Sequence, residues 1–138
     1  MRRFRFVEHT GDVGVMVYGD SLAGLFTHAA EALFHVMTEP RKIRDKESRN
    51  ISLKASGPEA LLVTWLNEFL YLFDTEMLLF RQFEIRELNG IELIATARGE
   101  TYQEGRHPIN TVVKAVTYHQ LKISNEKGVW KTRIIFDL

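Results

Sequence analysis

The chain has 138 residues, of which 45% are hydrophobic and 26% charged, a composition typical of a globular domain and unlike that of a disordered or membrane protein. Eighteen basic residues balance eighteen acidic ones, which excludes a strong overall field for holding nucleic acid. The chain has no cysteine, which excludes disulfides and thiolate metal sites and leaves His and carboxylate groups as metal ligands.

The N-terminal region predicts two strands and a helix. Residues 4–7 and 13–18 have the pattern of strands, and Ser21 is expected to cap a helix over residues 21–38, where apolar residues recur at helical spacing. Pro40 ends this helix, and the charged residues 41–50 are predicted to form a solvated loop. No apolar run approaches the roughly 18 residues that a membrane helix needs, so a cytoplasmic protein is expected.

Residues 51–74 predict a third strand and a second helix. Ile51, Leu53 and Ala55 alternate with polar residues, which indicates a half-buried strand. Pro58 suits the first turn of a helix, because proline has no N–H to lose there, and the helix is predicted over residues 58–74. Its wide apolar stripe, which predicts burial in the core, consists of Leu61, Leu62, Trp65, Leu66, Phe69, Leu70 and Phe73.

The rest of the chain predicts mainly strands. Asn-Gly at 89–90 is the preferred two-residue turn of a β-hairpin, here joining residues 81–88 to 91–97. Apolar spacing over 108–117 favours a short third helix, although its β-branched residues also suit a strand. A final strand is expected from Val129 to the terminus. The predicted class is α+β: two main helices, and the short third one, packed on a mixed, largely antiparallel sheet in a single domain over residues 1–138.

Polar residues gather between the first two predicted strands. His9, Thr10 and Asp12 lie beside Gly11 and Gly14, which tolerate the backbone angles of a turn. A plain turn does not require a histidine, a threonine and an aspartate together, so this segment predicts either a hydrogen-bonded loop or a site.

A second acidic group ends the chain. Asp137 lies beside the terminal carboxylate of Leu138, and two anions this close repel each other unless a cation or a donor lies between them. Asp12 becomes a third ligand if the first loop lies at the same sheet edge, and three oxygen donors suit Ca²⁺ or Mg²⁺. The alternative is a frayed terminus with a solvated Asp137.

Three segments together resemble the archease family: His-Thr-Gly-Asp-Val-Gly at 9–14, Lys-Ala-Val-Thr-Tyr-His at 114–119, and Phe-Asp-Leu at 136–138. They occur in the family's order and at its separations, and the resemblance covers essentially the whole chain. The family more often has alanine where Gly11 stands, a change from one small residue to another.

The resemblance implies a helper protein and not an enzyme. Its expected partner is the tRNA-splicing RNA ligase, which joins 2′,3′-cyclic phosphate and 5′-hydroxyl ends, and its expected effect is to promote guanylylation of the ligase and multiple turnover. RNA would be contacted only indirectly.

The resemblance also implies a divalent-metal site formed by Asp12, Asp137 and Leu138, with Lys114 as its basic residue. Ca²⁺ is the ion expected in the isolated protein, with Mg²⁺ or Mn²⁺ as alternatives. His9 and His119 are expected to assist by hydrogen bonding or partner contact, because hard ions select oxygen ligands.

Two other functions remain open from the residues alone. Asp12 and Asp137 with a histidine base would also suit a metal-dependent hydrolase, although the chain has no nucleophile motif and no phosphate-binding glycine loop. An RNA-binding module would use a basic patch on the terminal hairpin, made of Lys122, Lys127, Lys131 and Arg133.

Overall fold

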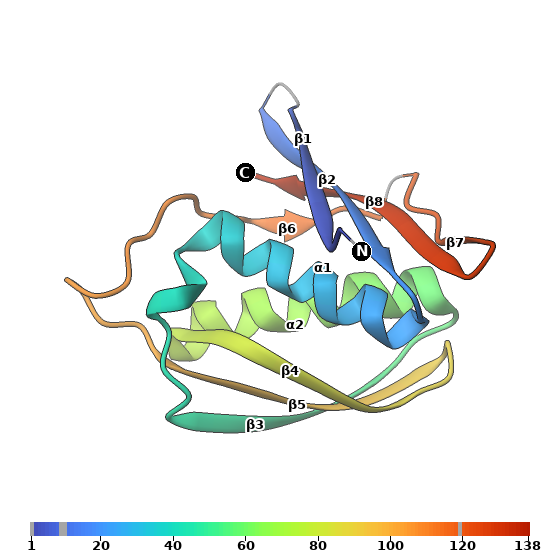
Figure 1. Ribbon diagram of the computed structural model, residues 1–138. Helices are drawn as coiled ribbons and strands as arrows, with labels where there is room; N and C mark the ends of the chain where they lie inside the picture. Colours follow the sequence, from blue (N-terminus) through green and yellow to red (C-terminus); the bar gives the residue numbers. More distant parts are fainter. Residues whose placement is uncertain (1, 9–10, 119) are drawn as a thin grey trace.

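In the computed structural model, which describes residues 2–8, 11–118 and 120–138, two α-helices lie between two β-sheets (Figure 1). In chain order the elements are β1 (Phe4–Glu8), β2 (Asp12–Gly19), α1 (Leu22–Met37), the 3-10 helix η1 (Pro40–Lys42), β3 (Glu47–Lys54), α2 (Pro58–Glu76), β4 (Leu78–Leu88), β5 (Glu92–Thr101), β6 (Ala115–Val116), β7 (Ser124–Glu126) and β8 (Val129–Asp137). The α+β class predicted from the sequence is confirmed.

The two sheets differ in size, and each described strand pair is antiparallel. The larger sheet has five strands in the order β1-β2-β8-β6, with β7 also paired to β8, and the smaller one has the order β3-β5-β4. Both helices contact both sheets, so they form a middle layer. The sequence predicted one mixed sheet. This was wrong because strand pattern shows which face is buried but not which strands pair.

The two helices begin where the sequence predicted. The Ser21 side chain accepts a hydrogen bond of 2.9 Å from the backbone N–H of Gly24, and Pro58 occupies the first turn of α2. Helix α2 ends at Glu76 and is followed by the cap residue Met77, whose φ of 57° lies in the left-handed region. No helix in the described part of the chain is both long and apolar enough to cross a lipid bilayer.

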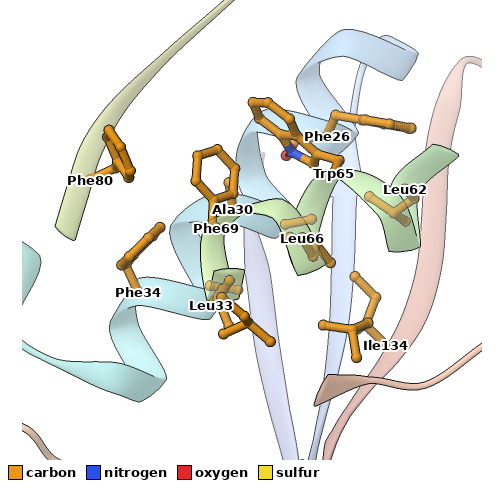
Figure 2. Close-up of a cluster of buried hydrophobic side chains, with 14 of the residues drawn as sticks. Phe26, Ala30, Leu33, Phe34, Leu62, Trp65, Leu66, Phe69, Phe80 and Ile134 are labelled. Carbon is orange, nitrogen blue, oxygen red and sulfur yellow. The ribbon is translucent and has the colours of Figure 1, made fainter. Parts of the chain in front are cut away.

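Aromatic side chains fill the core between the layers. Trp65 and Phe69 of α2 lie among Phe26 and Phe34 of α1 and Phe80 of β4 (Figure 2). All five are fully buried, and the Trp65 and Phe69 rings meet edge to face at 4.6 Å. The indole N–H of Trp65 donates to the backbone carbonyl of Phe26 at 2.9 Å, so the largest core side chain leaves no polar atom unpaired.

The predicted third helix over residues 108–117 is wrong. This segment has no regular structure up to Lys114, and its only described element is the short strand β6. Its backbone donors bond to distant partners: Asn110 N–H to the carbonyl of Met37 at 2.9 Å, and Val116 N–H to the side chain of Asn67 at 3.1 Å. These tertiary bonds replace the local bonds of a helix.

The predicted solvated loop over residues 41–50 is wrong in part. Residues 40–42 form η1, and Ile43 is fully buried. Strand β3 already begins at Glu47, four residues before the predicted strand. A single apolar residue among many charged ones gives no periodic signal, so the sequence pattern did not predict the burial of Ile43.

Candidate functional site

Two carboxylates predicted to share a site lie directly opposite each other in the larger sheet. The register of β2 and β8 pairs Asp12 with Asp137, and directly opposed residues have their Cβ atoms about 4.5–5.5 Å apart on one face. The next pair, Val13 and Phe136, packs toward the helices, so alternation places the two aspartates on the outer face of the sheet. Asp137 is exposed and Asp12 half-buried.

The C-terminus is held in the sheet. The backbone N–H of Lys114 donates to the carbonyl of Asp137 at 2.8 Å, and Ala115 pairs with Asp137 in the register of β6 and β8. The side chain of Leu138 packs against the core. The backbone of Asp137 is therefore fixed in the sheet, whereas its side chain is exposed, as the alternative of a solvated Asp137 supposed.

Lys114 is exposed, and its backbone N–H bonds to the carbonyl of Asp137. It also lines a groove of about 240 Å³ between the C-terminal ends of the two helices and the segment leading to β6, together with Phe73, Asp74, Ile109 and Val112. Val112 is 66% exposed, a high value for an aliphatic side chain. The other two residues predicted for the site, His9 and His119, lie outside the described residues, as does Thr10.

The donor set fits a hard divalent cation. Asp12 and Asp137 offer carboxylate oxygens, and the third carboxylate of the predicted set is the one expected at Leu138, one residue away. Like charges directly opposite in a sheet repel, and a cation between them would offset this cost. Within the described residues no group of three or more His, Cys, Asp or Glu side chains could hold a metal, so such a site would need the terminal carboxylate and ligands from water or a partner.

The basic patch proposed for RNA is partly neutralised. Lys131 Nζ lies 3.5 Å from a carboxylate oxygen of Glu126, on the neighbouring strand β7. The structure therefore gives the RNA-binding alternative less free positive charge than the sequence suggested.

A buried ionic cluster that the sequence did not reveal fixes the segment leading to Lys114. Glu100 is only 1% exposed and accepts hydrogen bonds from the backbone N–H of Arg44 at 2.6 Å, from Arg106 at 3.2 Å and from His107 Nε2 at 3.0 Å. His107 Nδ1 accepts from the N–H of Gln103 at 2.9 Å, which identifies the neutral ring with its proton on Nε2. The carboxylate of Glu100 thus connects β5 to the loop that contains Arg44 and to the loop that contains Arg106 and His107.

The pKa of Glu100 lies below its ordinary value. Burial alone raises the pKa of this carboxyl, but the hydrogen bonds from Arg44 N–H and His107, with the positive charge of Arg106, outweigh burial. A carboxyl whose folded-state pKa is depressed stabilises the fold above its unfolded pKa, near 4.5, and this stability is lost as the pH falls through the folded-state pKa.

Replacing Glu100 with Gln is expected to lower the free energy of unfolding at pH 7 by about 2 kcal/mol, because hydrogen bonds to a charged acceptor are lost. The difference between the variant and the parent should shrink in acid, as the pH falls from the unfolded pKa near 4.5 through the lower folded-state pKa of Glu100, where the parent carboxylate becomes protonated. Urea unfolding at pH 7 and over a series of acid pH values measures this. Glu104→Gln, an exposed position in the same loop, is the control and should change stability by less than about 0.5 kcal/mol. A Glu100→Gln deficit that is equally large in acid would contradict the assignment.

Sequence reasoning missed Glu100 and His107 because their pairing joins a strand to a loop seven residues on, with no local pattern to mark it. The sequence contains only a weak sign of this cluster. The charged residue Glu100 comes soon after the predicted hairpin, and His-Pro follows at 107–108.

Comparison with known proteins gives a consistent result along the whole chain. Residues 4–138 match the model of the Archease protein family (MTH1598/TM1083). The chain is similar to protein archease of Sulfolobus acidocaldarius, with 40% identity over 139 residues and all of both chains covered. It is also similar to protein archease of Methanosarcina mazei, with 35% identity over 141 residues, 99% of this chain and 97% of the relative.

Two solved structures share the fold. The solution structure of protein 1598 of Methanobacterium thermoautotrophicum is 38% identical, with a TM-score of 0.86 and all of both chains covered. A crystal structure from Thermotoga maritima, described as an archease and possible chaperone, is 26% identical, with a TM-score of 0.68, covering 100% of this chain and 98% of that one.

Proposed function

The chain belongs to the archease family, and we propose that it is a non-enzymatic activator of the tRNA-splicing RNA ligase that joins 2′,3′-cyclic phosphate and 5′-hydroxyl ends. In this role it promotes guanylylation of the ligase and lets the ligase turn over many times. The observation that carries the proposal is the register that sets Asp12 opposite Asp137 beside the held C-terminus, in a chain whose family match spans residues 4–138.

The chain has carboxylate groups suited to holding a cation where the ligase binds. Asp12, Asp137 and the terminal carboxylate of Leu138 form an oxygen-only set at one end of the paired strands β2 and β8, where the exposed side chain of Asp137 faces the approaching ligase. A divalent cation, when bound, supplies positive charge near phosphate oxygens during nucleotidyl transfer. The sheet fixes the two opposed aspartates, so little reorganisation is needed when the partner arrives.

Lys114 supplies a separate positive charge next to this edge. In the described part of the chain its ammonium group forms no ion pair with a carboxylate, and its backbone is held by the bond to Asp137. A lysine so positioned can donate to a phosphate or to a carboxylate of the ligase. The adjoining groove, with the exposed Val112, offers apolar contact area for the same partner.

The hydrolase alternative lacks support among the described histidines. His107 is committed to Glu100 and Gln103, and His28 Nδ1 donates to the carbonyl of Tyr18 at 2.6 Å. None of the three described histidines, His35 included, joins the aspartate pair in a potential metal-binding group.

Replacing Lys114 with Met is expected to reduce stimulation of the ligase by about 10- to 100-fold, because one charge-assisted hydrogen bond to the partner is lost. The thermal stability of the protein should not change. Multiple-turnover ligation with catalytic amounts of the variant measures this. Lys122→Met, another exposed lysine, is the matched control and should retain stimulation. Equal activity of both variants would remove Lys114 from the proposed mechanism.

A further inference from the structure

A cavity of about 430 Å³ opens where the edge strands of the two sheets leave one side of α1 uncovered. Strand β1 forms the edge of the larger sheet and β4 that of the smaller one, with α1 between them (Figure 1). The volume lies in the range of about 300–1,000 Å³ that is usual for small-molecule sites.

Aromatic rings form two walls of this cavity. Phe4 of β1 and His35 of α1 have ring centroids 5.2 Å apart on one side. Phe83 of β4 is stacked on the fully buried Phe34 at 6.0 Å, with an interplanar angle of 23°, which holds the Phe83 ring in place. Planar rings of this kind are the surfaces on which a nucleobase stacks, each worth about 1–3 kcal/mol.

Guanidinium groups line the same cavity. Arg3 Nη1 donates to both carboxylate oxygens of Glu31, at 2.8 and 2.9 Å, and Arg41 is paired with Glu39 at 2.9 Å. Arg81 differs: its Nη1 donates to the backbone carbonyl of Ile43 at 3.1 Å, and in the described part of the chain no carboxylate pairs with it. Its remaining donors and its uncompensated charge suit a phosphate.

An irregularity in β4 places Arg81 among the aromatic rings. Phe80 pairs with Gly99 and Gln82 with Arg98, so the register shifts at Arg81. Without this bulge, Phe80 and Phe83 would lie on opposite faces of the strand, since side chains alternate. With it, Phe80, Arg81 and Phe83 all line the cavity. Bulges that redirect side chains are frequent next to functional sites.

We propose that this cavity binds a nucleoside monophosphate, with the base between the Phe4–His35 pair and Phe83, and the phosphate at Arg81. The site is separate from the carboxylate edge. The carbonyl of Arg3 accepts from the N–H of Tyr18, which lies six positions along β2 from Asp12, or about 20 Å at 3.3 Å per residue. The inference does not depend on ligase activation.

The test is a titration of the isolated protein with AMP and GMP, followed by amide chemical shifts in two-dimensional NMR. We expect a Kd below about 1 mM for both, with shifts at residues lining the cavity. Ribose 5-phosphate, which has the phosphate but no base, should bind at least about tenfold more weakly than AMP.

The variants separate the charge of Arg81 from its structural role. Arg81→Ala and the more conservative Arg81→Gln, which keeps a donor for the carbonyl of Ile43, should each raise the Kd for AMP about tenfold or more. Arg86→Ala, at the other register shift of β4 and outside the cavity, should leave it unchanged. The proposal is overturned if neither nucleotide shifts the lining residues in the millimolar range, if ribose 5-phosphate binds as tightly as AMP, or if folded Arg81→Gln binds like the parent.

Discussion

Replacing Asp137 with Asn is expected to reduce stimulation of ligase guanylylation by about 100-fold or more, to the level of the ligase alone. Changing residues that merely support metal ligands costs about 10- to 100-fold in affinity or activity, so loss of one of two side-chain carboxylates should cost at least as much. The measurement is the yield of guanylylated ligase per unit time with the variant and with the parent protein.

The free energy of unfolding of Asp137→Asn, unlike its stimulation of the ligase, should not fall. Asp137 lies directly opposite Asp12, so removing one of the two negative charges relieves repulsion in the metal-free protein. The free energy of unfolding without added metal should therefore stay the same or rise by up to about 1 kcal/mol. Asp45→Asn, an exposed aspartate outside the sheet, is the control and should retain full stimulation. A folded Asp137→Asn protein that still stimulates the ligase fully would refute the proposed role of this carboxylate.

Replacing Trp65 with Ala is expected to have the largest effect on stability, about 3–5 kcal/mol of the free energy of unfolding. The indole is fully buried and contacts the rings of Phe69 and Phe83, so truncation leaves a cavity between the helices and the smaller sheet. It also removes the N–H that bonds to the carbonyl of Phe26. Since domains of this size are stable by only about 5–15 kcal/mol, the loss is a large fraction of the total.

Urea unfolding followed by circular dichroism tests this expectation. Tyr71→Ala, on the same helix but 60% exposed, provides the control and should change the free energy of unfolding by less than about 0.5 kcal/mol. If Trp65→Ala unfolds at the same urea concentration as Tyr71→Ala, the packing account of the core is wrong.

Local signals predicted the helices well. Ser21 and Pro58 are residues whose own chemistry favours a helix start, and both begin helices in the structure. The segment after Pro108 shows where such reasoning fails. Its apolar spacing suits a helix, but Asn110 bonds to Met37 and Lys114 to Asp137, partners that no local pattern can reveal.

The candidate site was predictable only as a set of residue types. Sequence alone places Asp137 beside the terminal carboxylate, whereas the approach of Asp12 depends on the pairing of β2 with β8, which are more than a hundred residues apart along the chain. The cavity at Arg81 was not predictable, because it depends on a register shift in β4 for which the sequence of the strand contains no signal.

The most direct test of the proposed function is to incubate the cognate RNA ligase with labelled GTP and Mg²⁺, with and without a trace of this protein, and then to follow repeated ligation. The proposal predicts faster labelling of the ligase and many turnovers with the parent protein, and neither with Asp137→Asn. Labelling and turnover that are unchanged by the parent protein would contradict the assignment as a ligase activator, and the fold would stand without it.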